Sequence, residues 1–370
     1  MCLNRLRNMD IIDPGRDKIF QLEARAGRRF NYLLALLVLG SILSIYLGCL
    51  FGRLEIPAEI VGKSILDAAG LKADSTLDPT WKMVVVNIRL SRICLSMLVG
   101  IALAVAGTVF QGILRNPLAD PFTIGVSTGA AFGASLALFF GFGSKQFLGF
   151  GLIPIASLAG AMAALFAVIS LGQISGQLRR ETMVLAGIVV ATFLSALISL
   201  IKSLDEESVA SIVFWVMGSF QGRGWNHFVF ALPYMIAGLL VIWIYSRELD
   251  ILSMGDTQAR QMGVRTEKVR LRLMIGASIL TAAAVSVSGV IGFIGLVMPH
   301  LIRMTMGAEH RKLLVLSGLL GGIALLWSDV LARTLLPEGE ELPVGVVTAI
   351  MGGPFFCLIL VKTGRNRTGL

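Results

Sequence analysis

The sequence predicts an all-α, polytopic membrane protein with about ten transmembrane helices and both termini in the cytoplasm. Of its 370 residues, 55% are hydrophobic and only 15% are charged, whereas about one quarter of a soluble domain is charged. Apolar stretches long enough to cross a bilayer recur along the chain. Because lipid offers the backbone no hydrogen-bonding partners, each crossing is expected to be a helix.

Ten apolar windows account for the predicted crossings. They lie near residues 31–51, 91–114, 121–141, 150–172, 182–203, 227–246, 271–290, 292–306, 312–336 and 343–362. The seventh and eighth are the least clearly divided, since only Gly289–Gly292 separates them. Glycines recur every fourth residue at Gly125, Gly129 and Gly133, and again at Gly318 and Gly322. This spacing favours close helix packing in lipid.

Two polar tails flank this ten-helix transmembrane region of residues 31–362. Residues 1–30 are too long and too acidic for a cleavable signal, so we expect a cytoplasmic tail followed by a retained first span. Residues 363–370 form the second predicted cytoplasmic tail.

The distribution of Lys and Arg sets the predicted orientation. The two tails, Arg115, Arg179–Arg180 and segments 247–272 and 303–312 together carry about two thirds of the 32 basic residues. The positive-inside rule places this side in the cytoplasm. The net charge of +9 follows from the topology, so no nucleic-acid partner is needed to explain it.

The longest cytoplasmic connection, 247–272, has the pattern of a short partner-binding helix. Ser253 and Asp256 are spaced as a capping box, and Gly263 suits a left-handed helix stop. An i, i+4 ion pair is expected between Asp256 and Arg260. One face is predicted to be apolar and to meet a partner. That face consists of Leu252, Gly255, Ala259 and Met262.

The sequence shows no pattern for catalysis, for a metal or for a nucleotide. Its four cysteines lack metal-ligand spacing, and no Ser/His/Asp or Cys/His set is present. Val61–Ser64 resembles the end of a phosphate-binding loop, but Pro57 stands where the first glycine belongs. Intramembrane charge is scarce. The exceptions are Asp329, with Arg333 at i+4 as a salt-bridge partner, and His300 after a kinking Pro, whose roles stay open.

Four motifs resemble one family, the FecCD-like permeases of type II ABC importers for iron-siderophores, haem and cobalamin. The resemblance extends from about Tyr32 to Lys362. The motifs are Arg89-Leu-Ser-Arg92, the Gln111–Pro121 segment, Gly292–His300 and Glu341–Ala349.

The resemblance implies the partners. Such permeases are homodimers, or pair with a close relative, in a bacterial or archaeal cytoplasmic membrane. Two ATP-binding subunits hold ATP and Mg, so no cofactor is expected in this chain. A substrate-binding protein docks on the outer face. The substrate is not determined by the sequence, and an iron complex is favoured as the commonest cargo of the family.

The resemblance also implies three sites. A coupling helix matches Leu252–Val264, and its residues are Leu252, Ser253, Gly255, Asp256, Ala259, Arg260, Met262 and Gly263. Three outer-face arginines are expected to bind the substrate-binding protein, and they are Arg89, Arg92 and Arg333. A cytoplasmic gate matches Asn116 and Leu118, with a second constriction at Arg179 and Arg180. Other members have small hydroxyl residues at that second place, so how it closes stays open. An outer-face helix is expected at Asp205–Gly218.

Two other classes of function stay open on the sequence alone. A secondary transporter would take up solute without any ATPase and would depend on an ion gradient. A scaffold would show no uptake under either condition.

Overall fold

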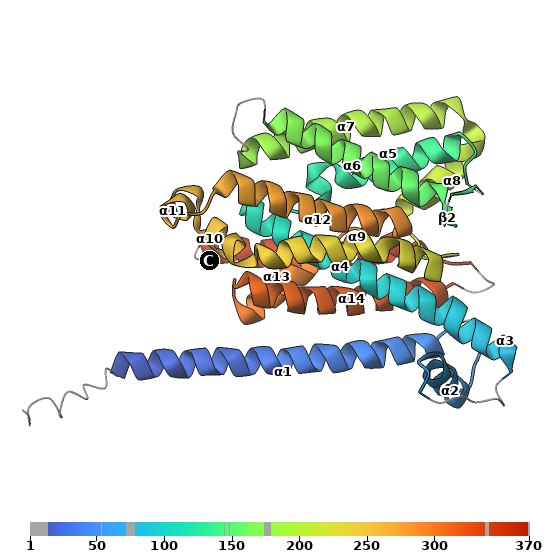
Figure 1. The fold of residues 1–370 in the computed structure, drawn as a ribbon, viewed down its shortest axis with the longest axis horizontal. Helices are drawn as coiled ribbons and strands as arrows, with labels where there is room; N and C mark the ends of the chain where they lie inside the picture. The colour runs from blue at the N-terminus through green and yellow to red at the C-terminus, as the bar shows by residue number, and fades with distance from the viewer. Residues whose placement is uncertain are drawn as a thin grey trace, which may run out of the picture.

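The computed structural model describes residues 14–52, 54–71, 78–143, 145–147, 149–173, 179–336 and 340–368, with side chains from residue 27 to residue 357. Helices run back and forth along one common direction (Figure 1). The longer helices are α1 (Pro14–Leu50), α4 (Ser91–Leu114), α5 (Val126–Phe139), α6 (Leu152–Gly172), α7 (Arg180–Leu204), α9 (Trp225–Ile244), α12 (Thr266–Ser288), α13 (Ile294–Met306), α14 (His310–Thr334) and α15 (Val344–Thr368).

Short elements join these helices. They are α2 (Ala58–Ala68), α3 (Pro79–Lys82), the π-helix η1 (Met83–Leu90), the 3-10 helix η2 (Pro121–Ile124), strands β1 (Gln146–Phe147) and β2 (Phe150–Gly151), and α8 (Glu206–Met217), α10 (Ser246–Met254) and α11 (Asp256–Gln261). The two strands pair antiparallel, with Gln146 opposite Gly151. The predicted outer-face helix at Asp205–Gly218 is confirmed as α8.

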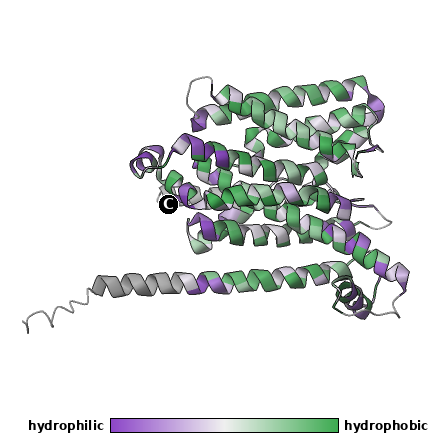
Figure 2. Cartoon of the chain, in the orientation of Figure 1, coloured by the Kyte–Doolittle hydropathy of each residue, from purple (hydrophilic) through white to green (hydrophobic). Residues whose placement is uncertain are grey.

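The predicted polytopic all-α fold is confirmed. Seven described helices are long and apolar enough to cross a membrane, and three shorter apolar helices, at Val126–Phe139, Ile294–Met306 and Val344–Cys357, match the third, eighth and tenth predicted spans. Hydrophobic residues cover the middle of the helices and polar residues collect at their ends (Figure 2).

Three element boundaries differ from the prediction. α1 begins at Pro14, within the predicted tail, and α12 begins at Thr266. The second span is preceded by α3 and η1, which make it continuous from Pro79 to Leu114. Val61–Ser64 lies inside α2, with Val61 and Ser64 buried, so this segment is not a phosphate-binding loop.

The centre of the bundle is formed by α4 and α12. In each, 78% of the most apolar window is buried, against 28% in α1, α7 and α9. The α1 helix packs on α14 along one side, whereas α5, α6 and α7 pack together on the other (Figure 1).

Glycines set the close contacts within this bundle, as predicted for Gly133. A Cβ on Gly133 of α5 would lie 2.1 Å from the Ala156 carbonyl oxygen of α6. A Cβ on Gly100 of α4 would lie 2.3 Å from the Gly321 carbonyl oxygen of α14. Small residues therefore let both helix pairs approach to backbone contact. Gly125 has a different role, since its φ of +79° joins η2 to α5.

Candidate functional site

The segment between α9 and α12 folds into two short helices, α10 and α11, which project at one end of the molecule (Figure 1). Gly255 separates them with φ 137° and ψ 156°, a conformation open to glycine. Gly263 has φ +83°, and the N–H groups of Gly263 and Val264 donate to the carbonyls of Arg260 and Ala259. The predicted left-handed stop at Gly263 is confirmed.

The predicted capping box is wrong, because Ser253 lies in the last turn of α10. Its Oγ donates to the Asp250 carbonyl at 2.6 Å, and α11 begins only at Asp256. The Asp256 carboxylate accepts from Arg270 at 2.6 Å. The predicted pair with Arg260 is therefore absent, and Arg260 donates to Thr266 Oγ1 at 3.4 Å. Asp256 thus anchors α11 to α12.

The predicted apolar face divides between the two sides of this segment. Leu252 and Ala259 are 2% and 0% exposed, so they pack into the protein's own core and cannot meet a partner. Met262 is 59% exposed, as is Met254. We define the tip surface as the exposed residues of this projection. They are Met254, Thr257, Gln258, Arg260, Gln261 and Met262.

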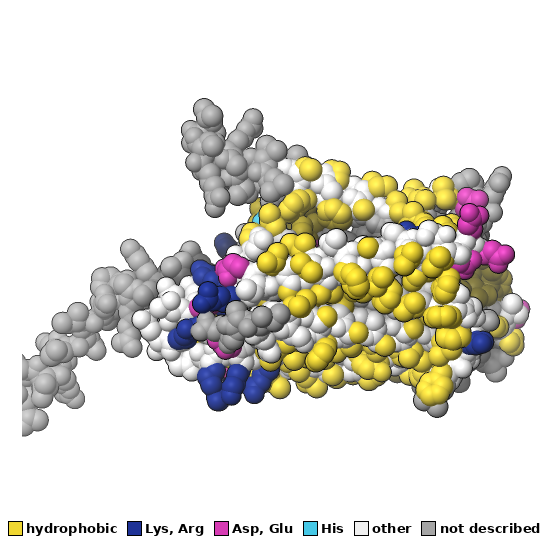
Figure 3. Space-filling model, turned by 90° about the horizontal axis from the view of Figure 1, so that it is seen from above, with side chains coloured by type: hydrophobic (Ala, Val, Ile, Leu, Met, Phe, Trp, Pro, Cys, Tyr) yellow, Lys and Arg dark blue, Asp and Glu magenta, His cyan; other side chains and the backbone are white. Residues whose placement is uncertain are grey.

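Basic side chains surround the tip surface. Arg115, Arg265 and Lys268 are exposed, and Figure 3 shows Lys and Arg gathered at the same end of the molecule. We call this end, which holds α10, α11 and the first turns of α12 and α14, the basic end. An apolar pair of methionines within a positive rim is suited to a partner with an apolar groove and acidic edges.

The gate loop predicted at Asn116 and Leu118 follows α4 at the basic end. Arg115 ends α4 in the left-handed region, with φ 50° and ψ 37°. Asn116 Oδ1 accepts from the Leu118 N–H at 3.0 Å, and Asp120 Oδ1 accepts from the Phe122 N–H at 3.1 Å. Two local turns therefore fix the loop, while Leu118 is 40% exposed. The expected rigid turn is confirmed, and its gating role stays a prediction.

The second predicted constriction lies where α7 begins. Arg179 is exposed and Arg180 half-buried, and residues 174–178 before them lie outside the described part of the chain. The α7 helix packs closely on η2, since a Cβ on Gly187 would lie 2.6 Å from the Thr123 carbonyl. The two predicted gate segments therefore sit on neighbouring elements.

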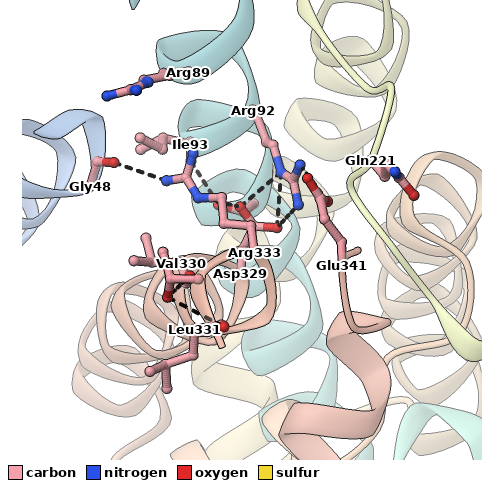
Figure 4. A network of polar contacts seen from close by, with 12 residues as sticks. Gly48, Arg89, Arg92, Ile93, Gln221, Asp329, Val330, Leu331, Arg333 and Glu341 are labelled. Atoms are coloured by element: carbon pink, nitrogen blue, oxygen red, sulfur yellow. Dashed lines mark hydrogen bonds and ion pairs between the residues drawn. The ribbon is translucent and has the colours of Figure 1, made fainter. Parts of the chain in front are cut away.

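The three predicted docking arginines are buried in the half of the molecule away from the basic end. Arg89, Arg92 and Arg333 are 5%, 7% and 7% exposed. Arg92 Nε donates to both carboxylate oxygens of Asp329 at 3.0 Å (Figure 4). Its NH1 donates to Glu341 at 2.9 Å. The predicted Asp329–Arg333 contact is present but long, at 3.9 Å.

Arg89 and Arg333 hold the end of α1. Arg89 donates to the carbonyls of Cys49 at 2.8 Å and Leu50 at 3.1 Å, and also to that of Leu54. Arg333 donates to the Gly48 carbonyl at 2.9 Å (Figure 4). The carbonyls of Gly48, Cys49 and Leu50 belong to the last turn of α1, where a helix leaves carbonyls without helical partners and favours cations. These side chains are therefore engaged inside the fold and are not exposed, and their role in docking the binding protein stays a prediction.

A hollow lined by both apolar and polar residues opens beside α7, α8 and α5. It has a volume of about 560 Å³, and Ser127, Thr128, Ser195, Ser199 and Lys202 contribute its polar lining. Ser127 Oγ is buried and has no hydrogen-bond partner. Sequence reasoning missed this hollow. The signal was present in span 182–203, where Thr192, Ser195, Ser199 and Ser203 recur at helical spacing.

This hydroxyl stripe on α7, defined by Thr192, Ser195, Ser199 and Ser203, is exposed along one side of the helix. A spanning helix normally turns apolar side chains to lipid. Hydroxyls in this position indicate a water-accessible or protein-covered face.

Comparison with known proteins decides the family. The sequence model of the FecCD transport family matches residues 36–362. This chain belongs to the FecCD transport family. The hemin transport system permease protein HmuU of Yersinia pestis is 40% identical over 301 residues, covering 80% of this chain and 88% of its own. The cobalamin import system permease protein BtuC of Halobacterium salinarum is 39% identical, covering 76% and 74%.

A solved structure agrees with the FecCD fold. An inward-facing conformation of a metal-chelate type ABC transporter has a TM-score of 0.76 and 31% identity, and covers 90% of this chain and 99% of its own. The chain is thus the multi-pass membrane permease of an ABC importer. Members of the FecCD family are transport components, so the resemblance drawn from the four sequence motifs is confirmed.

Proposed function

We propose that two copies of this chain form a translocation path for an iron chelate, and that ATP hydrolysis on separate subunits drives import through the tip surface. The observation that carries the proposal is the tip surface itself, two exposed methionines at 59% each on helices anchored to the bundle. A partner that pushes on this projection acts on a firmly held element, because Asp256 ties α11 to Arg270 at 2.6 Å.

The hydroxyl stripe supports the dimer. Ser195 and Ser199 are exposed at membrane depth on α7 and line the 560 Å³ hollow with Lys202. In a lone subunit these polar groups would face lipid, which is unfavourable. A second copy that covers this side would enclose them in a shared aqueous path. Pairing with a paralogue would have the same effect and is the alternative arrangement.

The lining of the hollow also supports the substrate class. The hydroxyl and apolar side chains of the lining carry no charge, whereas Lys202 supplies positive charge on the side of the path away from the basic end. Anionic metal chelates, which include ferric siderophores and haem, would be attracted by such a charge. Docking of the outer binding protein at Arg89, Arg92 and Arg333 would require these buried side chains to become accessible.

Reconstitution tests this proposal. The permease is placed in liposomes with or without its ATPase, with binding protein and ferric siderophore, haem or cobalamin outside. The proposal predicts uptake of a ferric chelate only with both ATPase and ATP. Uptake driven by an ion gradient in the absence of the ATPase would instead establish a secondary transporter. Absence of uptake in every arm would favour a scaffold.

A further inference from the structure

The α10 helix is joined to α14 by one carboxylate. Asp250 Oδ1 lies 2.8 Å from the backbone nitrogen of His310 and 2.7 Å from its Nδ1. A carboxylate of this kind only accepts, so both His310 groups donate and the ring proton lies on Nδ1. His310 is the first residue of the 25-residue helix α14. Asp250 therefore caps α14 from another element, where a negative charge is favoured.

A second contact holds the same junction. Arg311 Nε donates to Ser246 Oγ at 3.1 Å, and the Arg311 guanidinium lies 5.5 Å from the centre of the Trp243 ring. The first residue and the middle of α10 are therefore attached to the first turn of α14.

The junction also touches the end of α4 that carries the gate loop. A Cβ placed on Gly112 would lie 2.7 Å from His310 Nε2 and 2.8 Å from Leu249 Cδ1. His310 Nε2 is buried and has no hydrogen-bond partner, so it packs against Gly112 without being held there. The gate loop begins only four residues later, at Asn116.

The bend between α10 and α11 also lies close to the end of α4. A Cβ placed on Gly255 would lie 2.3 Å from Gln258 Oε1 and 3.4 Å from Arg115 NH1. Gln258 belongs to the tip surface and Arg115 ends α4. The side chain of Arg115, the residue just before the gate loop, therefore lies beside the backbone that joins the two tip helices.

The helices α4 and α14 are joined along their length, so we expect them to move together. Gly100 and Gly321 bring their backbones into contact, and Arg92 and Asp329 pair at 2.7 Å at the far end. A force applied to His310 at the basic end is thus carried by the pair as a rigid unit.

We infer that the Asp250–His310 junction transmits the ATPase stroke from α10 to the cytoplasmic ends of α14 and α4, and so to the gate loop at Asn116–Leu118. The inference rests on the proposed function and assigns Asp250 and His310 as positioning residues of the transport reaction. Neither side chain touches substrate or ATP.

The test measures substrate transported per ATP hydrolysed in the complete complex in liposomes. Asp250→Ala removes both acceptor contacts, and we expect this ratio to fall by about tenfold while ATP hydrolysis continues. Asp250→Asn keeps a carbonyl oxygen that accepts both bonds, so we expect most of the ratio to be retained. The control is Glu309→Ala, which removes an exposed partner of Lys312 (2.5 Å) one residue from His310.

His310→Ala provides a second route if Asp250→Ala fails to fold. It keeps the backbone N–H bond to Asp250 and loses the ring, so an intermediate fall is expected. An unchanged ratio in both alanine variants would overturn the inference. A parallel loss of hydrolysis and uptake, at an unchanged ratio, would show a purely structural junction and would overturn it too. No ATP-dependent uptake by the wild-type complex would instead reject the proposed function.

Discussion

Arg92 of α4 and Asp329 of α14 stand 237 positions apart in the sequence, yet the Arg92 guanidinium donates to both carboxylate oxygens of Asp329. Asp329 is fully buried. The same guanidinium reaches Glu341, in the segment before α15, at 2.9 Å. One arginine therefore links three parts of the permease in the half away from the basic end.

Replacing Asp329 with Ala should destabilise the permease by about 3–5 kcal/mol, because the buried Arg92 charge loses its main partner. Thermal melting in detergent would measure this loss. Glu309→Ala, which breaks an exposed ion pair with Lys312, should cost less than about 1 kcal/mol. Equal melting of the two variants would contradict the stabilising role of the buried pair.

Gly107 tests the close packing of α4 on α13. A Cβ at Gly107 would lie 1.9 Å from the Gly295 carbonyl oxygen, whereas a Cβ at Gly292 would meet nothing within 4 Å. We expect Gly107→Ala to destabilise the fold by about 1–3 kcal/mol, as overpacking does. Gly292→Ala should melt close to wild type. The packing account fails if the two alanine variants melt alike.

A charge placed on the tip surface should weaken partner binding without destabilising the fold. Met262→Asp and Met254→Asp alter side chains that are 59% exposed, whereas Leu252→Asp alters one that is 2% exposed. We expect the methionine variants to melt like wild type but to bind the ATPase at least about tenfold more weakly. Leu252→Asp should destabilise the permease itself. Titration of labelled ATPase onto permease in nanodiscs would measure the binding, and undiminished affinity in both methionine variants would reject this partner surface.

Asp120 at the gate loop should give the permease a pH-dependent stability. Burial raises the pKa of Asp120 from 3.8 to about 7, and the hydrogen bond from Phe122 opposes this shift. Because the folded-state pKa is the higher one, the folded protein binds more protons than the unfolded chain between these values. Stability contributed by the neutral carboxyl is therefore present at low pH and is lost as pH rises through about 7.

Asp120→Asn keeps an oxygen to cap η2 and removes the titration. The melting temperature of the wild type relative to the variant should therefore be highest below about pH 4, fall between about pH 4 and pH 7, and stay low at about pH 8. Parallel melting curves across this range would show that Asp120 titrates as an ordinary surface carboxyl.

The spans were predictable because membrane length and hydrophobicity are local properties of the sequence. The glycine contacts of Gly129 and Gly133 followed from spacing in the same way. The helix break at Gly255 could not be predicted from the sequence. A glycine between polar residues is compatible with the interior of a short helix and also with a sharp bend. The burial of Leu252 and Ala259 against the bundle, which is a tertiary contact, distinguishes the bend from a continuous helix.

The buried arginines show a second limit of sequence reasoning. Arg89, Arg92 and Arg333 were correctly assigned to the side away from the basic end, and charge on that side suggested exposure. Their partners are the carbonyls at the end of α1 and the Asp329 carboxylate. Contacts across so many intervening residues follow from the tertiary fold and not from local pattern. The Asp250–His310 junction, 60 positions apart, was missed for the same reason.

The most direct test of the account is uptake of a ferric chelate into liposomes that contain the permease with its ATPase and binding protein. The account predicts uptake that requires ATP, persists when ion gradients are collapsed and stops when the ATPase is omitted. Uptake that survives without the ATPase and disappears with the ion gradient would contradict it.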